Sequence, residues 1–271
     1  MQQKPEKIRQ RKDHKKNAVV VKEYAYQDTM NYPIRQQQED SYFAFDDFYA
    51  DGKCSLFGVL DGHGGCDVVQ YATEHIPEEY KNIDPNGTMD PFKVFPQLLE
   101  KIEKQLVIVG AADQGTCCCL VLIRIEGNQK VAYVANLGDT RAVLDKNGKA
   151  ERVSTDHKAT NQQEQDRIKK DGGIIIRNRV SGQLAVTRAL GDLDLKTEGV
   201  IITPDIKKIE LEKDDNFIII ASDGLWDVVD DQQAVTLQKS QDNIQNSCAK
   251  LVEEAIQKNS RDNISVLVIR L

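Results

Sequence analysis

The sequence predicts an α+β fold in which a β core is flanked by helices. Short runs rich in Val, Ile and aromatic residues, bounded by Gly, Asn or Asp, recur along most of the chain and are typical of strands. Segments with an apolar period of 3.6 residues form two separate groups. Strands, a first helix group, more strands and a second helix group favour α+β over a regular alternation of parallel units.

The predicted strands are short, as expected for a layered β core. In chain order they are Ala18–Val21, Tyr42–Phe45, Leu56–Leu60, Cys117–Ile125, Val131–Ala135, Ala142–Leu144, Phe217–Ala221 and Ile264–Leu271. The pair Asn147-Gly148 lies between two such runs and is typical of a type I′ hairpin, because both residues tolerate positive φ.

Five helices are predicted from the apolar period: 66–76, 91–107, 161–171, 230–239 and 243–258. Asn161 followed by Glu164 resembles a capping box, and Gly172-Gly173 is a typical helix end. The segment from about 155 to 215 has the least regular pattern, so we expect it to form a flap beside an active site.

The net charge of −7 is distributed unevenly between a basic tail and an acidic body. Residues 1–17 contain seven Lys or Arg and two acidic residues, which gives +5 and leaves −12 for the rest. An acidic body is not typical of a nucleic-acid-binding protein. The tail is too polar to fold alone, and we hypothesise that it binds an acidic protein partner, such as a cytoskeletal or other large assembly.

The N-terminus lacks an apolar stretch, and the most apolar runs are too short to cross a bilayer. We therefore expect no signal peptide, no membrane association and a cytoplasmic or nuclear location. Three of the six cysteines are consecutive, so in a strand Cys118 points opposite to Cys117 and Cys119. We interpret the cysteines as core residues of a reducing compartment. Cys66 lies near a predicted helix start that can lower its pKa, so a redox role there stays open beside a packing role.

Four short motifs each place an Asp at the edge of a strand-like run. They are Arg35-Gln36-Gln37-Gln38-Glu39-Asp40, Asp61-Gly62-His63-Gly64-Gly65, Asp223-Gly224-Leu225-Trp226-Asp227 and Asp262-Asn263. Carboxylate and carbonyl oxygens suit Mg²⁺ or Mn²⁺ better than zinc. The Asp side chains and the Gly62 carbonyl would hold two ions about 3.5–4 Å apart with a bridging water, whose hydroxide attacks phosphorus in line.

An arginine and a histidine within these motifs add the remaining groups for phosphoester hydrolysis. The planar fork of Arg35 suits phosphate oxygens, and His63 can protonate the leaving oxygen. Each feature alone has a simpler explanation: Asp-Gly is a common turn pair, Arg35 can form a surface ion pair with Glu39, and His63 can be an ordinary loop residue. The ordered set favours the functional interpretation. His75 and His157 are interpreted as residues without a catalytic role.

From about residue 20 to the C-terminus, the sequence resembles the metal-dependent Ser/Thr protein phosphatases of type 2C, the PPM family. The resemblance rests on the four motifs and on further segments: Gly115-Thr116, Leu137–Arg141, Asp156-His157-Lys158 and Gly182–Asp192. The sequence departs from the family pattern at Ala159, at Thr203-Pro204-Asp205 and at Cys118, all away from the expected metal centre.

The resemblance implies a four-layer αββα fold, in which two antiparallel sheets pack face to face between antiparallel helix pairs. Residues 18–271 would form the catalytic domain. Implied roles are a bridging ligand for Asp61, water positioning for Asp40, phosphate binding for Arg35 and general acid catalysis for His63. Further implied ligands are Glu39, the Gly62 carbonyl, Asp223 and Asp262, with Asp139 and Asp227 forming a weaker third metal site.

The function predicted from these observations is Mg²⁺- or Mn²⁺-dependent dephosphorylation of phosphoserine and phosphothreonine in proteins. Two alternatives remain open. A weakly active or inactive family member can serve as a docked scaffold subunit, although such a protein normally lacks some of the metal Asp residues. A two-metal phosphodiesterase or nuclease is the other, and the acidic body argues against it.

Overall fold

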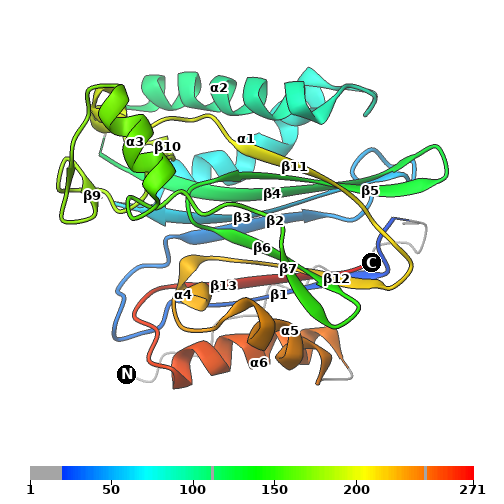
Figure 1. Cartoon of the computed structure of the whole chain (residues 1–271). Coiled ribbons are helices and arrows are strands. Elements are labelled where there is room, and N and C mark those ends of the chain that lie inside the picture. Colours follow the sequence, from blue (N-terminus) through cyan, green and yellow to red (C-terminus); the bar gives the residue numbers. More distant parts are fainter. Residues whose placement is uncertain (1–19, 111–112, 241–242) are drawn as a thin grey trace, which may run out of the picture.

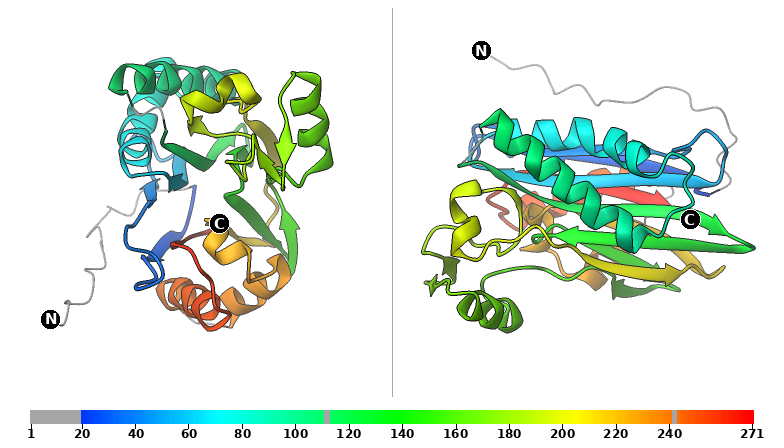
Figure 2. Two further views of the ribbon diagram at one scale, coloured as in Figure 1. Left: turned by 90° about the vertical axis from the view of Figure 1, so that its left-hand side faces the viewer. Right: turned by 90° about the horizontal axis from the view of Figure 1, so that it is seen from above.

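The computed structural model describes residues 20–110, 113–240 and 243–271. The basic tail, 1–17, and the first two residues of the predicted strand Ala18–Val21 lie outside these described residues. Helix pairs cover the outer faces of two stacked sheets (Figure 1), and the same four layers are visible from the side (Figure 2). The predicted αββα sandwich is confirmed.

Both sheets of the sandwich are antiparallel. The first has the strand order β1-β13-β12-β6-β7, formed by Glu23–Thr29, Ile264–Arg270, Asp215–Ala221, Arg141–Lys146 and Lys149–Arg152. The second has the order β11-β5-β4-β3-β2, formed by Asp205–Glu210, Gln129–Leu137, Gly115–Glu126, Cys54–His63 and Asp40–Phe45. The first and the last strand of the sandwich, β1 and β13, are thus paired neighbours in one sheet.

The strand β4 shows how period-two alternation builds two cores from one strand. Cys118 and Leu120 pack in the core between this sheet and the first helix pair, whereas Cys119 and Val121 pack between the sheets. The predicted opposite orientation of the consecutive cysteines is confirmed, and all six cysteines of the chain are free.

Helices α1 (Asp67–Ile83) and α2 (Pro91–Val109) cover the second sheet, while α5 (Asp231–Lys239) and α6 (Ile244–Gln257) cover the first. The prediction that the first helix ends at residue 76 is wrong, because α1 continues through Pro77. Tyr80 lies beyond this proline, is fully buried and packs against Phe48 and Phe95. That burial offsets the backbone hydrogen bond that proline cannot donate. Among the described helices, none combines the length and apolarity needed to span a bilayer.

The first predicted strand is also misplaced. Val20 and Val21 are buried but not in a strand, and β1 begins at Glu23. Tyr24 and Tyr26 pack against the core between the sheets, and Ala25, between them, packs on the α6 side. This alternation of buried faces, rather than the more apolar Val run, decides where the ladder forms.

Residues 155–204 contain α3 (Gln162–Lys170), the short hairpin β8–β9 (Ile175–Ile176 and Arg179–Val180), β10 (Leu190–Gly191) and the 3-10 helix η1 (Leu193–Glu198). Of these, β10 joins the second sheet by pairing with the start of β4. The end predicted for the flap, at about 215, overlaps the sheet strand β11. Asn161 caps α3 by accepting from the Gln163 backbone, but the predicted capping box does not form. Glu164 instead accepts hydrogen bonds from Thr187 and Arg188, which lie elsewhere in the same segment. The predicted type I′ turn agrees with the positive φ of Asn147 (51°) and Gly148 (87°).

Candidate metal centre

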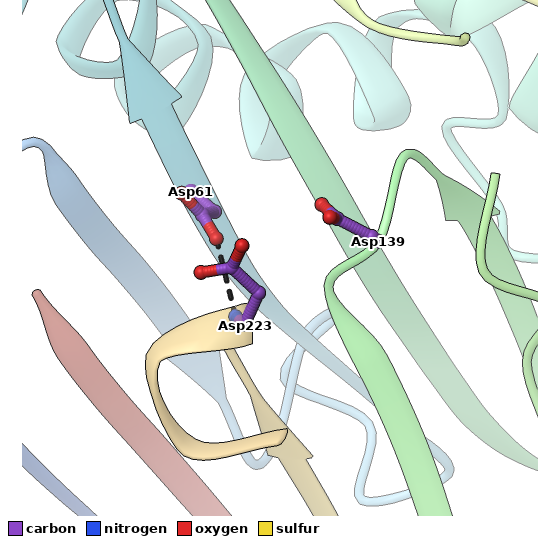
Figure 3. Close-up of side chains that lie close together, drawn as sticks. All are labelled: Asp61, Asp139 and Asp223. Atoms are coloured by element: carbon purple, nitrogen blue, oxygen red, sulfur yellow. Dashed lines mark hydrogen bonds between the residues drawn. The ribbon is translucent and has the colours of Figure 1, made fainter. Parts of the chain in front are cut away.

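Three carboxylates converge at one end of the sandwich from three different elements. Asp61 is near the end of β3, Asp139 follows β5, and Asp223 begins the short helix α4 (Asp223–Trp226) directly after β12 (Figure 3). One carboxylate oxygen from each residue lies within 4.8 Å of the others. The Asp223 backbone N–H donates to Asp61 Oδ2 at 3.2 Å and fixes the two residues relative to each other.

The charges in this cluster are poorly compensated by the protein. Burial, followed by the charge of Asp223, raises the pKa of Asp61 well above its usual range, and burial followed by Asp139 does the same for Asp223. Burial also raises the pKa of Asp139, although Lys158 opposes this effect. A set of oxygen ligands that repel one another when ionised fits a hard divalent cation, which would neutralise them.

Asp40 extends the cluster along the sheet edge. It lies directly opposite Asp61 in the β2–β3 ladder and is 8% exposed. Its Oδ2 accepts a hydrogen bond of 2.7 Å from the Ser222 hydroxyl, yet burial raises the pKa of Asp40 to about 7. Asp40 and Asp61 are therefore neighbours on adjacent strands of this sheet.

Arg35 and Asp262 form an ion pair beside this cluster, and the charge of Asp262 contributes to the raised pKa values of Asp61 and Asp223. The Arg35 Nη1 also lies 4.0 Å from Glu39, so the surface ion pair considered for Arg35 is present at long range. About 40% of the Arg35 side chain is exposed, which leaves it accessible to a ligand.

The loop before β2 is held against the start of β13 by one buried amide. Asn263 Oδ1 accepts from the Glu39 backbone N–H, and Asn263 Nδ2 donates to the carbonyls of Met30 and Gln37. Close packing also explains Gly62, because a Cβ there would lie 2.5 Å from the Glu39 carbonyl oxygen. These contacts bring Glu39 and Gly62 next to each other although they are far apart in the sequence.

Asp139 and Asp227 are bridged by an ammonium group of the protein. Lys158 Nζ lies 2.8 Å from Asp227 Oδ1 and 3.4 Å from Asp139 Oδ2. Asp227 lies at the C-terminal end of α4, and Lys158 belongs to the first residues of the flap segment. The carboxylate pair expected to form a third metal site thus contacts Lys158 in the structure.

The three histidines of the described residues differ in their contacts. His63 ends β3, two residues after Asp61, and its Nε2 lies 2.9 and 2.8 Å from the two carboxylate oxygens of Asp192. His75 stacks on Tyr71 within α1, and buried His157 accepts from the Gly138 N–H. Sequence reasoning assigned no role to Asp192, because only the β10–β4 pairing places it beside His63.

Cys66 packs against the core beside α1, as in the packing role considered for it. It is the residue before α1, but burial, with Glu39 and Asp67, raises rather than lowers the pKa of its thiol. Burial, together with these two carboxylates, disfavours the thiolate, so the raised pKa gives no support to a redox role.

The structure is thus a four-layer sandwich with a carboxylate cluster at one end of its sheets. The chain matches the Protein phosphatase 2C family over residues 25–264. Among curated relatives, it is 34% identical over 251 residues to Probable protein phosphatase 2C 32 of Oryza sativa subsp. japonica. That alignment covers 88% of this chain and 63% of the rice protein.

A second relative, Protein phosphatase 2C homolog 1 of Saccharomyces cerevisiae, is 31% identical over 255 residues, covering 89% of this chain and 90% of the yeast protein. The solved structure of a serine-threonine phosphatase 2C from Toxoplasma gondii superposes with a TM-score of 0.75 at 20% identity, covering 91% of this chain and 94% of that one. The chain belongs to the protein phosphatase 2C family. It spans less than two thirds of the rice relative's length.

Proposed function

We propose that the chain is a protein serine/threonine phosphatase that depends on Mg²⁺ or Mn²⁺. The observation that supports the proposal is the combination of a partly buried carboxylate cluster with an exposed arginine and a histidine two residues from Asp61. Membership of the protein phosphatase 2C family supports the same reaction. Phosphoproteins would be the substrates.

Two divalent ions would be held by Asp61, Asp223, Asp262, Glu39 and the Gly62 carbonyl, with Asp139 and Asp227 as a weaker third site. Bound there, such ions would lower the pKa of a coordinated water and neutralise negative charge on the phosphate. The third site requires Lys158 to leave at least one of its two carboxylates, because its ammonium group contacts both.

The protein's own side chains would then bind the phosphate and move protons. Arg35 would exchange part of its contact with Asp262 for two phosphate oxygens, which a guanidinium binds through parallel N–H donors. Asp40 would orient the attacking water by accepting a hydrogen bond from it. His63 would donate a proton to the Ser or Thr oxygen as the P–O bond breaks.

The test compares hydrolysis of a phosphothreonine peptide by the wild type and Asp223→Asn, with Mn²⁺, with Mg²⁺ and with EDTA. We expect metal-dependent turnover in the wild type and a loss of at least about 100-fold in the variant, because a carboxylate ligand becomes neutral. Asp214→Asn is the matched control, since Asp214 is exposed and outside the cluster. A folded wild type that binds Mn²⁺ but leaves the peptide intact would favour the scaffold role. Preferential cleavage of a phosphodiester would favour the nuclease alternative.

We also infer a catalytic domain of residues 18–271 that works in a reducing compartment, the cytoplasm or nucleus. The six free cysteines support this location, because disulfides are typical of oxidising compartments. The basic tail, 1–17, would serve as the docking segment for an acidic partner.

A further inference from the structure

Asp192 is a buried carboxylate that contacts one nitrogen of His63 with both of its oxygens. Only 5% of Asp192 is exposed, compared with 30% of the His63 side chain. The two distances to Nε2, 2.9 and 2.8 Å, are those of hydrogen bonds. The pair therefore has a protected end at Asp192 and an accessible end at the imidazole.

The backbone around Asp192 is arranged to reach this histidine. β10 pairs with the first residues of β4, and Gly115 of β4 lies opposite His63 of β3. Asp192 follows β10 with φ of 48°, a left-handed conformation that residues other than glycine seldom adopt. Its N–H donates to the Gln114 carbonyl at 2.8 Å and holds this conformation.

Gly115 provides the space in which the two side chains meet. A Cβ at this position would lie 2.2 Å from Asp192 Oδ2 and 2.5 Å from His63 Nε2. Any larger residue would therefore separate the carboxylate from the imidazole, and the absence of a side chain is a requirement of the contact.

A second ion pair anchors the other side of the same turn. Glu103 of α2 accepts from the Gly191 N–H at 2.9 Å and pairs with Lys196 Nζ at 2.8 Å. Lys196 also donates to the Ala189 carbonyl. Asp192 is thus fixed from β4 on one side and from α2 on the other.

The chemistry follows from the inequivalence of the two imidazole nitrogens. A carboxylate accepts hydrogen bonds only, so Nε2 must carry a proton towards Asp192. Nδ1 is then the nitrogen that can exchange a proton with another group. A histidine free to rotate or change tautomer would present the correct nitrogen for only part of the time.

We propose that Asp192 is a positioning residue for His63: it holds the proton on Nε2 and fixes the ring so that Nδ1 delivers the proton to the leaving oxygen. The inference rests on the proposed phosphatase function. In the step, the P–O bond to the Ser or Thr oxygen breaks and that oxygen takes the Nδ1 proton. The ring is left neutral and keeps its Nε2 proton, which remains hydrogen-bonded to Asp192, and solvent then returns a proton to Nδ1.

The first arm of the test observes the tautomer directly, without turnover. Long-range ¹H–¹⁵N spectra of protein labelled at histidine, recorded where the imidazole is neutral, distinguish the two tautomers, and His63→Gln identifies the His63 signals. We expect the Nε2–H form in the wild type and a mixture in Asp192→Asn. Asparagine keeps the volume of aspartate and tolerates left-handed φ, so the variant is expected to fold. The same His63 tautomer in both proteins would overturn the proposal.

The second arm measures kcat on two substrates, a phosphothreonine peptide and an aryl phosphate whose phenolate leaves without protonation. Asp192→Asn should lower kcat on the peptide about 100-fold, with little change in KM, but on the aryl ester less than about threefold. Adding Asp192→Asn to His63→Gln should cause no further loss, because both act through one proton transfer. Asp194→Asn, an exposed change in η1, is the control.

Equal losses on both substrates, or a further loss in the double variant, would overturn the positioning role. A wild type that binds Mn²⁺ but hydrolyses neither substrate would overturn the proposed function, and with it the proton-delivery part of this inference. The tautomer spectra would in that case still decide whether Asp192 controls His63.

Discussion

At the scale of single residues, the centre is built from carboxylates that the fold places close together against their mutual repulsion. Asp40, Asp61 and Asp223 all have raised pKa values, with burial as the largest cause. Their neighbours Ser222 and the Asp223 N–H donate hydrogen bonds but supply no full positive charge. The same residues that prepare the site for a cation should therefore destabilise the protein without one.

Asp40 makes this cost measurable as a dependence of stability on pH. Its pKa of about 7 in the folded state exceeds the usual value, so the folded protein binds more protons and stability falls as pH rises from about 4 to 7. The upper bound is about 4 kcal/mol, from about three pKa units at 1.36 kcal/mol each. In EDTA, thermal unfolding should occur at a higher temperature at pH 5.5 than at pH 7.5.

Asp40→Asn should flatten this slope, whereas Asp194→Asn should leave it unchanged. The window above pH 5 avoids Glu79, Glu126 and Glu164, whose pKa values are lowered to about 2 and whose contributions are lost only at lower pH. An equally steep slope in Asp40→Asn would show that other groups cause the effect.

At the scale of elements, the centre depends on how loops are tied to strand ends. Asn263 joins the segment containing Arg35 and Glu39 to β13, and Lys158 joins the flap segment to α4. Burial lowers the pKa of Lys158, but the charges of Asp139 and Asp227 outweigh this effect, so its pKa is raised. Residues 155–204 and the carboxylate cluster are therefore linked by the charge of Lys158.

Lys158→Met should loosen the beginning of the flap segment. A partly buried ion pair of this kind contributes about 1–2 kcal/mol, which corresponds to about five- to thirty-fold faster hydrogen exchange. The informative amides are those of His157 and Ala159, which donate to the carbonyls of Gly138 and Ala185. Lys169→Met, on the exposed face of α3, is the matched control. Unchanged exchange at both amides would contradict a tether through Lys158.

At the scale of the whole molecule, cation binding should be linked to global stability. The proposed ligands lie at strand ends of both sheets, since β3 of one sheet contains Asp61 and Asp223 follows β12 of the other. Unfolding either sheet would therefore destroy the site. By mass action, Mn²⁺ at one hundred times its Kd stabilises the folded state by about 2.7 kcal/mol.

For a chain of 271 residues, this corresponds to a rise in Tm of about 5–10 °C on adding Mn²⁺ to the EDTA-treated protein. Differential scanning calorimetry of the wild type and Asp223→Asn would measure it, with the smaller rise expected for the variant. An equal rise in both proteins would place the cation somewhere other than this centre.

The sequence by itself determined the α+β class, most of the element positions and the acidic motifs, because apolar periodicity and ligand chemistry are local properties, whereas the four-layer arrangement was expected only from the family resemblance. It failed at Pro77, where distant burial of Tyr80 outweighs the local preference, and at β1, where pairing with β13 selects the strand. Only the tertiary structure decided that Lys158 bridges Asp139 and Asp227 and that Asp192 contacts His63. The Lys158–Asp227 and Asp192–His63 contacts join residues 69 and 129 positions apart, respectively, through sheet pairing and loop closure, which local sequence patterns do not encode.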